Sequence, residues 1–62
     1  MKKPVCKLIG EDGNIFNLLA IARRALLEDD LIPEANEMRD RVMASKSYNE
    51  ALAIISEYVE IV

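Results

Sequence analysis

The feature that most constrains this chain is a helical segment, residues 15–28, whose apolar side chains cover more than half of its circumference. The polar residues Asn17, Arg24 and Glu28 occupy one narrow arc, and Asn14 is placed to cap the start of the helix. A single packing partner covers a much narrower stripe than this. The segment is therefore either the central helix of a bundle or a helix shared with another subunit. Its apolar members are Ile15, Phe16, Leu18, Leu19, Ala20, Ala22, Ala25, Leu26 and Leu27.

Two further helices are indicated, one by a narrow apolar stripe and one by a capping box. The stripe predicts a helix that has Pro33 in its first turn, is capped by Asp30 or by the backbone just before Pro33, and runs to about Ala44. This helix is expected to be peripheral because the stripe is narrow. On the same helix, Glu37 and Arg41 form an i, i+4 pair in the favourable order. The capping box of Ser47 and Glu50 predicts that a third helix begins directly after Ser47. The stripe consists of Leu31, Ala35, Met38 and Val42.

The two ends of the sequence are β-prone. Val5 to Ile9 forms a short strand or an extended arm, bounded by Pro4 and Gly10. The segment Tyr58 to Val62 either continues the third helix or leaves it to pair with Val5 to Ile9, and its composition leaves both outcomes open. The sequence thus predicts a mostly α fold: one compact three-helix domain over residues 1–62 with a short N-terminal strand.

Composition excludes several classes of function. The net charge of -3 disfavours general nucleic-acid binding, which needs a cationic face. With no histidine and one cysteine, Cys6, the chain has neither the ligands of a Cys/His zinc cluster nor a histidine-dependent catalytic triad. No stretch approaches the roughly 20 apolar residues of a membrane span. We therefore expect a non-enzymatic, cytoplasmic protein without a metal or a cofactor.

The apolar fraction of the chain predicts self-association. Apolar residues make up 52% of only 62 positions, which is more than so small a body readily buries by itself. Much of this excess lies on residues 15–28. We expect a homo-oligomer whose interface is formed by Phe16, Ala20, Ile21 and Leu27.

Arg23 and Arg24 form the only basic doublet inside a predicted helix, and two interpretations are open. In the first, Arg24 is solvated while Arg23 pairs with a carboxylate, either Glu57 or Asp40. In the second, the arginines and their symmetry mates clamp an anion at a subunit interface. The expected ligand is then a small anionic nucleotide, held by Arg23, Arg24, Lys7, Asn14 and Asn17.

The second predicted helix has an acidic face formed by Glu34, Glu37 and Asp40. The first two helices superficially resemble a helix-turn-helix, but a recognition helix should be basic, so DNA reading is disfavoured. An acidic face instead suits a basic surface on a host protein. The alternative function is therefore a protein-interaction adaptor or inhibitor.

Three stretches of the sequence carry a resemblance. They are Lys-Leu-Ile-Gly-Glu-Asp-Gly-Asn at residues 7–14, Tyr-Asn-Glu-Ala-Leu at 48–52 and Glu-Tyr-Val at 57–59. With these, the chain resembles a group of small proteins from bacteria and their phages. The resemblance implies a phage or mobile-element setting, in which small helical homo-oligomers act stoichiometrically as anti-defence proteins. Some such proteins sequester nucleotide immune signals.

Overall fold

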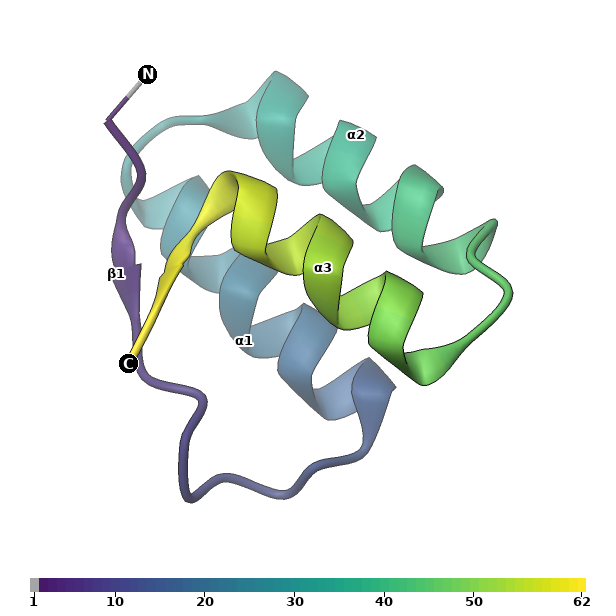
Figure 1. Cartoon of the computed structure of the whole chain (residues 1–62). Helices are drawn as coiled ribbons and strands as arrows, with labels where there is room; N and C mark the ends of the chain where they lie inside the picture. Colours follow the sequence, from purple (N-terminus) through teal and green to yellow (C-terminus); the bar gives the residue numbers. More distant parts are fainter. Residues whose placement is uncertain (1) are drawn as a thin grey trace.

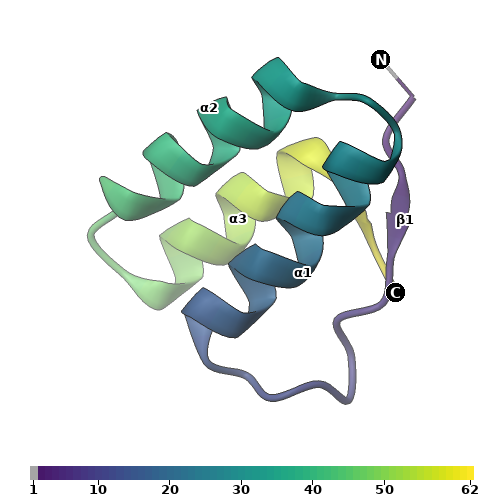
Figure 2. The same cartoon turned by 180° about the vertical axis from the view of Figure 1, so that it is seen from behind.

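Three helices and a two-stranded sheet make up the computed structural model, which describes residues 2–62 (Figure 1). The order along the chain is β1 (Val5–Cys6), α1 (Ile15–Glu28), α2 (Ile32–Met43), α3 (Tyr48–Tyr58) and β2 (Glu60–Ile61). Figures 1 and 2 show the helices side by side and both strands at one end of them. The predicted mostly α, three-helix fold is confirmed.

Local signals define both ends of α1. The Asn14 side chain accepts a hydrogen bond from the Phe16 amide at 2.9 Å, which confirms the predicted cap. At the other end, Asp30 adopts a left-handed backbone with φ of 59°. The amide of Leu31 then reaches the carbonyl of Leu26 at 2.9 Å, and the amide of Asp30 reaches Leu27 at 3.1 Å. This pair of bonds is the Schellman arrangement, which stops the helix and turns the chain toward α2.

The starts of α2 and α3 also follow the sequence. Pro33 lies in the first turn of α2, where its missing N–H costs nothing. The Ser47 hydroxyl accepts a hydrogen bond from the Glu50 amide at 3.1 Å, as the capping box predicts. The Glu50 carboxylate reaches back to the amide of Lys46 at 3.2 Å, one residue before the cap. Both helices thus begin within about one residue of their expected starts.

The two ends of the chain meet in a parallel sheet. β1 pairs with β2 in the register Val5 with Glu60 and Cys6 with Ile61. α3 ends because Val59 has an extended backbone, with φ of -133° and ψ of 151°. Of the two outcomes left open for the C-terminal segment, departure from the helix is therefore the one realised. Beyond β2, the amide of Val62 donates to the Cys6 carbonyl at 3.0 Å.

The core explains the wide apolar arc of α1. Leu18, Leu19, Ala22 and Leu26 are buried, and α1 packs against α2, α3 and β1. α1 is thus a bundle helix that contacts both other helices and β1, although Phe16 and Ala20 of its apolar arc stay exposed. α2 also packs on both other helices, so the prediction that it is peripheral is wrong; it buries three of the four residues of its stripe, and Leu31 is half-buried. Burial also raises the pKa of the Cys6 thiol, which lies in this core.

Candidate functional site

A groove of about 380 Å³ runs along α1 and α2 and combines an apolar floor with three arginines. Arg23 and Arg24 come from α1, and Arg39 comes from α2. Successive turns of α1 place the apolar lining residues at i, i+3 and i+4 spacing, so they share one face. The apolar lining residues are Phe16, Leu19, Ala20 and Leu27. The groove thus offers cationic donors beside an apolar surface.

Arg23 is half-buried and has no carboxylate partner among residues 2–62. One of its terminal nitrogens, Nη2, donates to Oδ1 of Asn36 at 3.2 Å. Its Nε is shielded from solvent and has no hydrogen-bond acceptor. A neutral amide holds the guanidinium in place but leaves its charge uncompensated. A buried donor without an acceptor costs free energy in the folded chain.

The predicted carboxylate partners of Arg23 are wrong, because both are already paired with arginines of α2. Arg41 binds Glu57 through two parallel hydrogen bonds, Nη1 to Oε1 at 2.9 Å and Nη2 to Oε2 at 3.0 Å. Arg39 contacts Asp40, its neighbour in the chain, at 3.1 Å. The first of the two interpretations of Arg23, in which it pairs with a carboxylate, therefore does not hold among the described residues.

Arg24 and Arg39 add charge to the same groove. The Arg24 side chain is exposed, and no hydrogen bond or ion pair binds it within the described residues. The side chains of Arg39 and Asp40 are 46% and 70% exposed, so water screens this pair and it holds Arg39 only weakly. Three cations and one carboxylate leave the groove with a positive local charge in a chain whose net charge is -3.

The other predicted ligand-binding residues lie outside the groove. Asn14 caps α1, and the Asn17 amide donates to the Asp12 carbonyl at 2.9 Å, so both stabilise the loop before α1. Lys7 directly follows β1, outside the groove lining. The structure therefore does not bring these three residues together with the two arginines in this groove.

The groove also includes three of the four residues predicted to form an oligomer interface. Phe16, Ala20 and Leu27 line it, whereas Ile21 packs half-buried against the core. Sequence reasoning assigned neither Leu19 nor Arg39 of the lining to a site. Arg39 lies four residues after the buried Ala35, and its neighbour in the chain is a carboxylate, so its sequence context carries no sign of an anion site.

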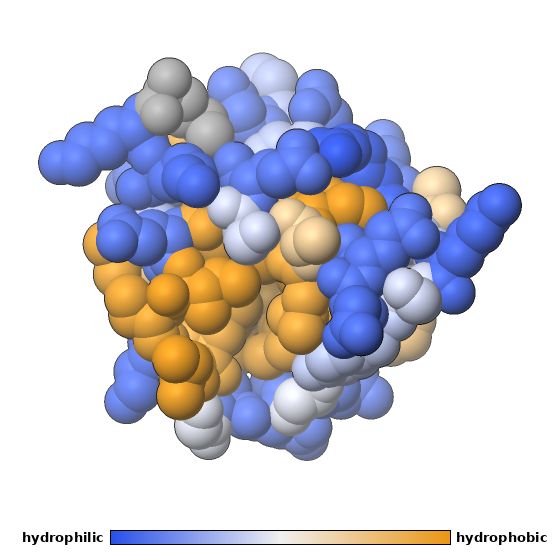
Figure 3. Space-filling view, in the orientation of Figure 1, coloured by the Kyte–Doolittle hydropathy of each residue, from blue (hydrophilic) through white to orange (hydrophobic). Residues whose placement is uncertain are grey.

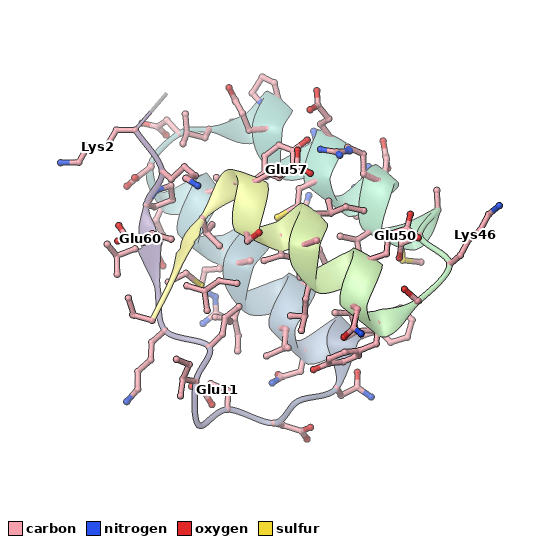
Figure 4. All side chains as sticks on the ribbon, in the orientation of Figure 1. Lys2, Glu11, Lys46, Glu50, Glu57 and Glu60 are labelled. Atoms are coloured by element: carbon pink, nitrogen blue, oxygen red, sulfur yellow. The ribbon has the colours of Figure 1, made fainter. Side chains whose placement is uncertain are left out.

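A second hollow of about 320 Å³ adjoins the groove on the other side of Phe16. Its one charged lining residue is Lys46, and the rest of its wall comes from the first turn of α1, the end of α2, the connection after it and the start of α3. This connection, with Lys46 and Glu50, forms the end of the molecule opposite the sheet in Figure 4. With a single flexible cation, this hollow is less suited to an anion than the arginine groove.

The acidic residues of α2 are partly engaged within the chain. Glu37 accepts a hydrogen bond from the Tyr58 hydroxyl, which in turn accepts one from Arg41 at 3.1 Å. Burial, followed by the Glu37 bond, raises the pKa of Tyr58. Arg41 also lies 5.7 Å from the centre of the Tyr58 ring. The predicted i, i+4 pair of Glu37 and Arg41 is therefore replaced by contacts of both residues with α3.

The α2 face keeps less unpaired charge than its sequence indicates. Asp40 is paired with Arg39, and Glu34 is half-buried in the first turn of α2. Because Glu37 is bound to Tyr58, two of the three residues of the predicted adaptor surface, Glu37 and Asp40, already have partners within the chain. The structure gives the adaptor hypothesis no further support.

Comparisons with known proteins identify no family that could assign a role to this site. No protein family, no curated protein and no solved structure matches the chain. Within residues 2–62, no group of three or more potential metal-ligating side chains comes together. In the same part of the chain, no helix has the length and apolar character to cross a membrane. The arginine groove is therefore the candidate site on its own geometry.

Proposed function

We propose that this protein is a non-enzymatic binding protein that holds a small anionic ligand in the groove between α1 and α2. The observation that carries the proposal is Arg23, a half-buried guanidinium with no carboxylate partner and with an unpaired, shielded Nε. Arg24 and Arg39 lie on the same groove and supply further donors. A phosphate or carboxylate would bind the accessible N–H groups of these guanidiniums, because a guanidinium binds both kinds of group in a fork.

The groove favours an anion that also has a flat or apolar body. Its volume of about 380 Å³ is at the lower end for sites that bind small molecules, and Phe16 lies at its edge, 62% exposed. An aromatic ring stacks on such a side chain, and the arginines would hold the charged end. A nucleotide has both parts. The sequence resemblance supports a specific biological role: the protein would sequester a nucleotide immune signal and so act against host defence.

Stoichiometric binding fits the chemistry that the sequence offers. The chain has no histidine, and the charged groups of the groove are guanidiniums, which stay protonated and do not act as general bases at neutral pH. Such a site lowers the concentration of its ligand by holding it. The ligand would be recovered chemically unchanged after the protein is denatured.

Titration calorimetry against nucleotides tests the proposal. The panel contains a nucleoside monophosphate, a cyclic mononucleotide and a linear and a cyclic dinucleotide, with an uncharged nucleoside and inorganic phosphate as references. We expect saturable binding of at least one nucleotide and weaker binding of both references. Absence of heat with every nucleotide, confirmed by equilibrium dialysis, would overturn the nucleotide assignment.

Variants of the groove separate a specific site from general attraction. Arg23→Gln should lower the affinity for the nucleotide at least tenfold. Arg23→Lys should not restore the affinity, because an ammonium lacks the planar fork. Arg39→Gln should weaken it several-fold. Lys46→Gln removes one exposed cation from outside the groove and is the matched control, with expected affinity within about twofold. Equal losses in all these variants would contradict a site at Arg23.

A further inference from the structure

The outward face of the terminal sheet is an apolar surface that the fold leaves uncovered. Along the N-terminal segment the side chains alternate: Cys6 and Leu8 are buried in the core, whereas Val5 and Ile9 are 63% and 70% exposed. Val62, beyond β2, is 45% exposed. Figure 3 shows a continuous apolar patch on the side where the strands lie. We call Val5, Ile9 and Val62, with Lys7 and Glu60, the sheet face.

The charges on the sheet face are complementary to one another. Lys7 and Glu60 are both exposed and alternate outward with the aliphatic residues. Neither forms an ion pair within residues 2–62. In the sheet register Glu60 lies opposite Val5, two positions before Lys7, so the two charges are at different heights along the strands. A half-turn about an axis that lies in the plane of the face and runs across the strands turns a second copy face to face with the first. It also exchanges these heights and brings Lys7 of one copy to Glu60 of the other.

The rim of the sheet face repeats this arrangement. Figure 4 shows Lys2 at one end of this side of the molecule, Glu11 at the other and Glu60 between them. The same half-turn brings Lys2 of one copy to Glu11 of the other. Opposite charges at opposite ends of an apolar face are self-complementary, whereas a face of a single charge would select a different partner.

We propose that the sheet face is the surface on which two copies of this chain associate, as a two-fold symmetric dimer. A standard interface covers about 800 Å² of each partner, roughly a fifth of the 4071 Å² that this molecule exposes. The sheet has only two residue pairs and packs on α1 and α3 with its inner face, so its outer face is the one open to a second copy. The proposal moves self-association from α1, where the sequence predicted it, to the chain termini.

This surface shares no residue with the arginine groove, so the two proposals stand or fall separately. A dimer formed through the sheet face leaves Arg23, Arg24 and Arg39 of each copy available to a ligand. Each dimer would thus carry two equivalent grooves. A dimer formed through Phe16 and Ala20 would instead cover the groove.

A charge-exchange series tests the proposed dimer, with mass measured by sedimentation equilibrium from micromolar to millimolar protein. Wild type should dimerise. Lys7→Glu and Glu60→Lys should each raise the dimer dissociation constant at least tenfold, because each places like charges together twice. The double variant restores opposite charges and should return to within about threefold of wild type. Lys46→Glu, at the opposite end of the molecule, is the matched control and should change nothing.

Further outcomes decide against the proposal. A wild-type monomer at millimolar concentration overturns it, as does a dimer that neither single reversal weakens. Loss of the dimer in Phe16→Ser with retention in Lys7→Glu would place the interface on α1 instead. If circular dichroism shows that a charge reversal unfolds the chain, Ile9→Ser removes exposed apolar surface without a charge and should itself weaken the dimer at least fivefold.

Discussion

Arg41 of α2 holds Glu57 of α3 in a fork, with Nη1 and Nη2 at 2.9 and 3.0 Å from the two carboxylate oxygens. The same guanidinium donates to the Tyr58 hydroxyl, so one side chain joins two consecutive residues of α3. This geometry orients the two helices as well as attracting them, since a fork fixes the plane of both groups. It also takes Glu57 away from Arg23, which is why the groove arginine keeps an uncompensated charge.

Stability should depend on pH through Glu57. The hydrogen bonds from Arg41 hold the pKa of this carboxyl below its ordinary value of 4.5 in the folded chain. The unfolded state therefore binds the proton first as pH falls, and the stabilisation present at neutral pH is lost from about pH 5 downward. We expect the denaturation midpoint of wild type to fall more steeply between pH 5 and pH 3 than that of Glu57→Gln.

A partner variant serves as the control for the pH experiment. Arg41→Met removes the cation and should flatten the same part of the curve, and combining it with Glu57→Gln should flatten it no further. Parallel curves for wild type and both single variants would show that the fork contributes nothing to acid sensitivity.

The Tyr58 hydroxyl should contribute measurably to stability. It is a buried group that donates to Glu37 and accepts from Arg41 at 3.1 Å. Tyr58→Phe removes both bonds and should lower the free energy of unfolding by about 1–2 kcal/mol. For a domain of this size the thermal midpoint should then fall by roughly 8–15 °C.

Tyr48→Phe is the matched control for this variant. The Tyr48 hydroxyl donates to the Gly13 carbonyl at 2.6 Å, but the residue is exposed, and water can replace the bond. We expect a change within about 0.5 kcal/mol. Equal losses in the two tyrosine variants would contradict a special role for the contact between α2 and α3.

The helices were predictable from the sequence because their signals are local. Asn14 and Ser47 each cap a helix through atoms two or three residues away, so no knowledge of the fold is needed to place them. The α2 stripe was equally readable, because helical spacing alone puts Ala35, Met38 and Val42 on one face. The sheet was not predictable in the same way, because its two strands are more than fifty residues apart in the sequence. β propensity alone does not decide whether the C-terminal segment pairs with the N-terminal one or continues the helix by one more turn.

The site depended on contacts between helices that spacing does not reveal. The i, i+4 rule correctly places Glu37 and Arg41 on one face of α2, but both turn to Tyr58 of α3 once the helices pack. Arg23 lost its expected partners for the same reason. Arg39 became part of the groove through the packing of α1 on α2. Charge partners between elements were therefore the least predictable part of the chain.

The Ser47 cap should be the most sensitive exposed position in the connection between α2 and α3. Its hydroxyl accepts from the Glu50 amide at 3.1 Å, which satisfies a donor that the first turn of α3 cannot. Ser47→Ala should lower the free energy of unfolding by about 1 kcal/mol. Thermal denaturation followed by circular dichroism measures this, with Ser47→Asp retaining most of the stability. An unchanged midpoint in Ser47→Ala would mean that water replaces the cap without loss.

Asp30 should be a position where a substitution stabilises the fold. Its φ of 59° lies in the left-handed region, where a β-carbon is disfavoured, and its carboxylate lies beside the negative end of the α1 dipole. Asp30→Gly removes both penalties, and the relief should exceed the entropy that glycine loses on folding, for a net gain of about 0.5–1 kcal/mol. Asp29→Asn is the control, because residue 29 has φ of -95° and the change removes a charge alone. Urea titration should show a smaller gain for Asp29→Asn than for Asp30→Gly; equal gains would attribute the whole effect to charge and none to the backbone.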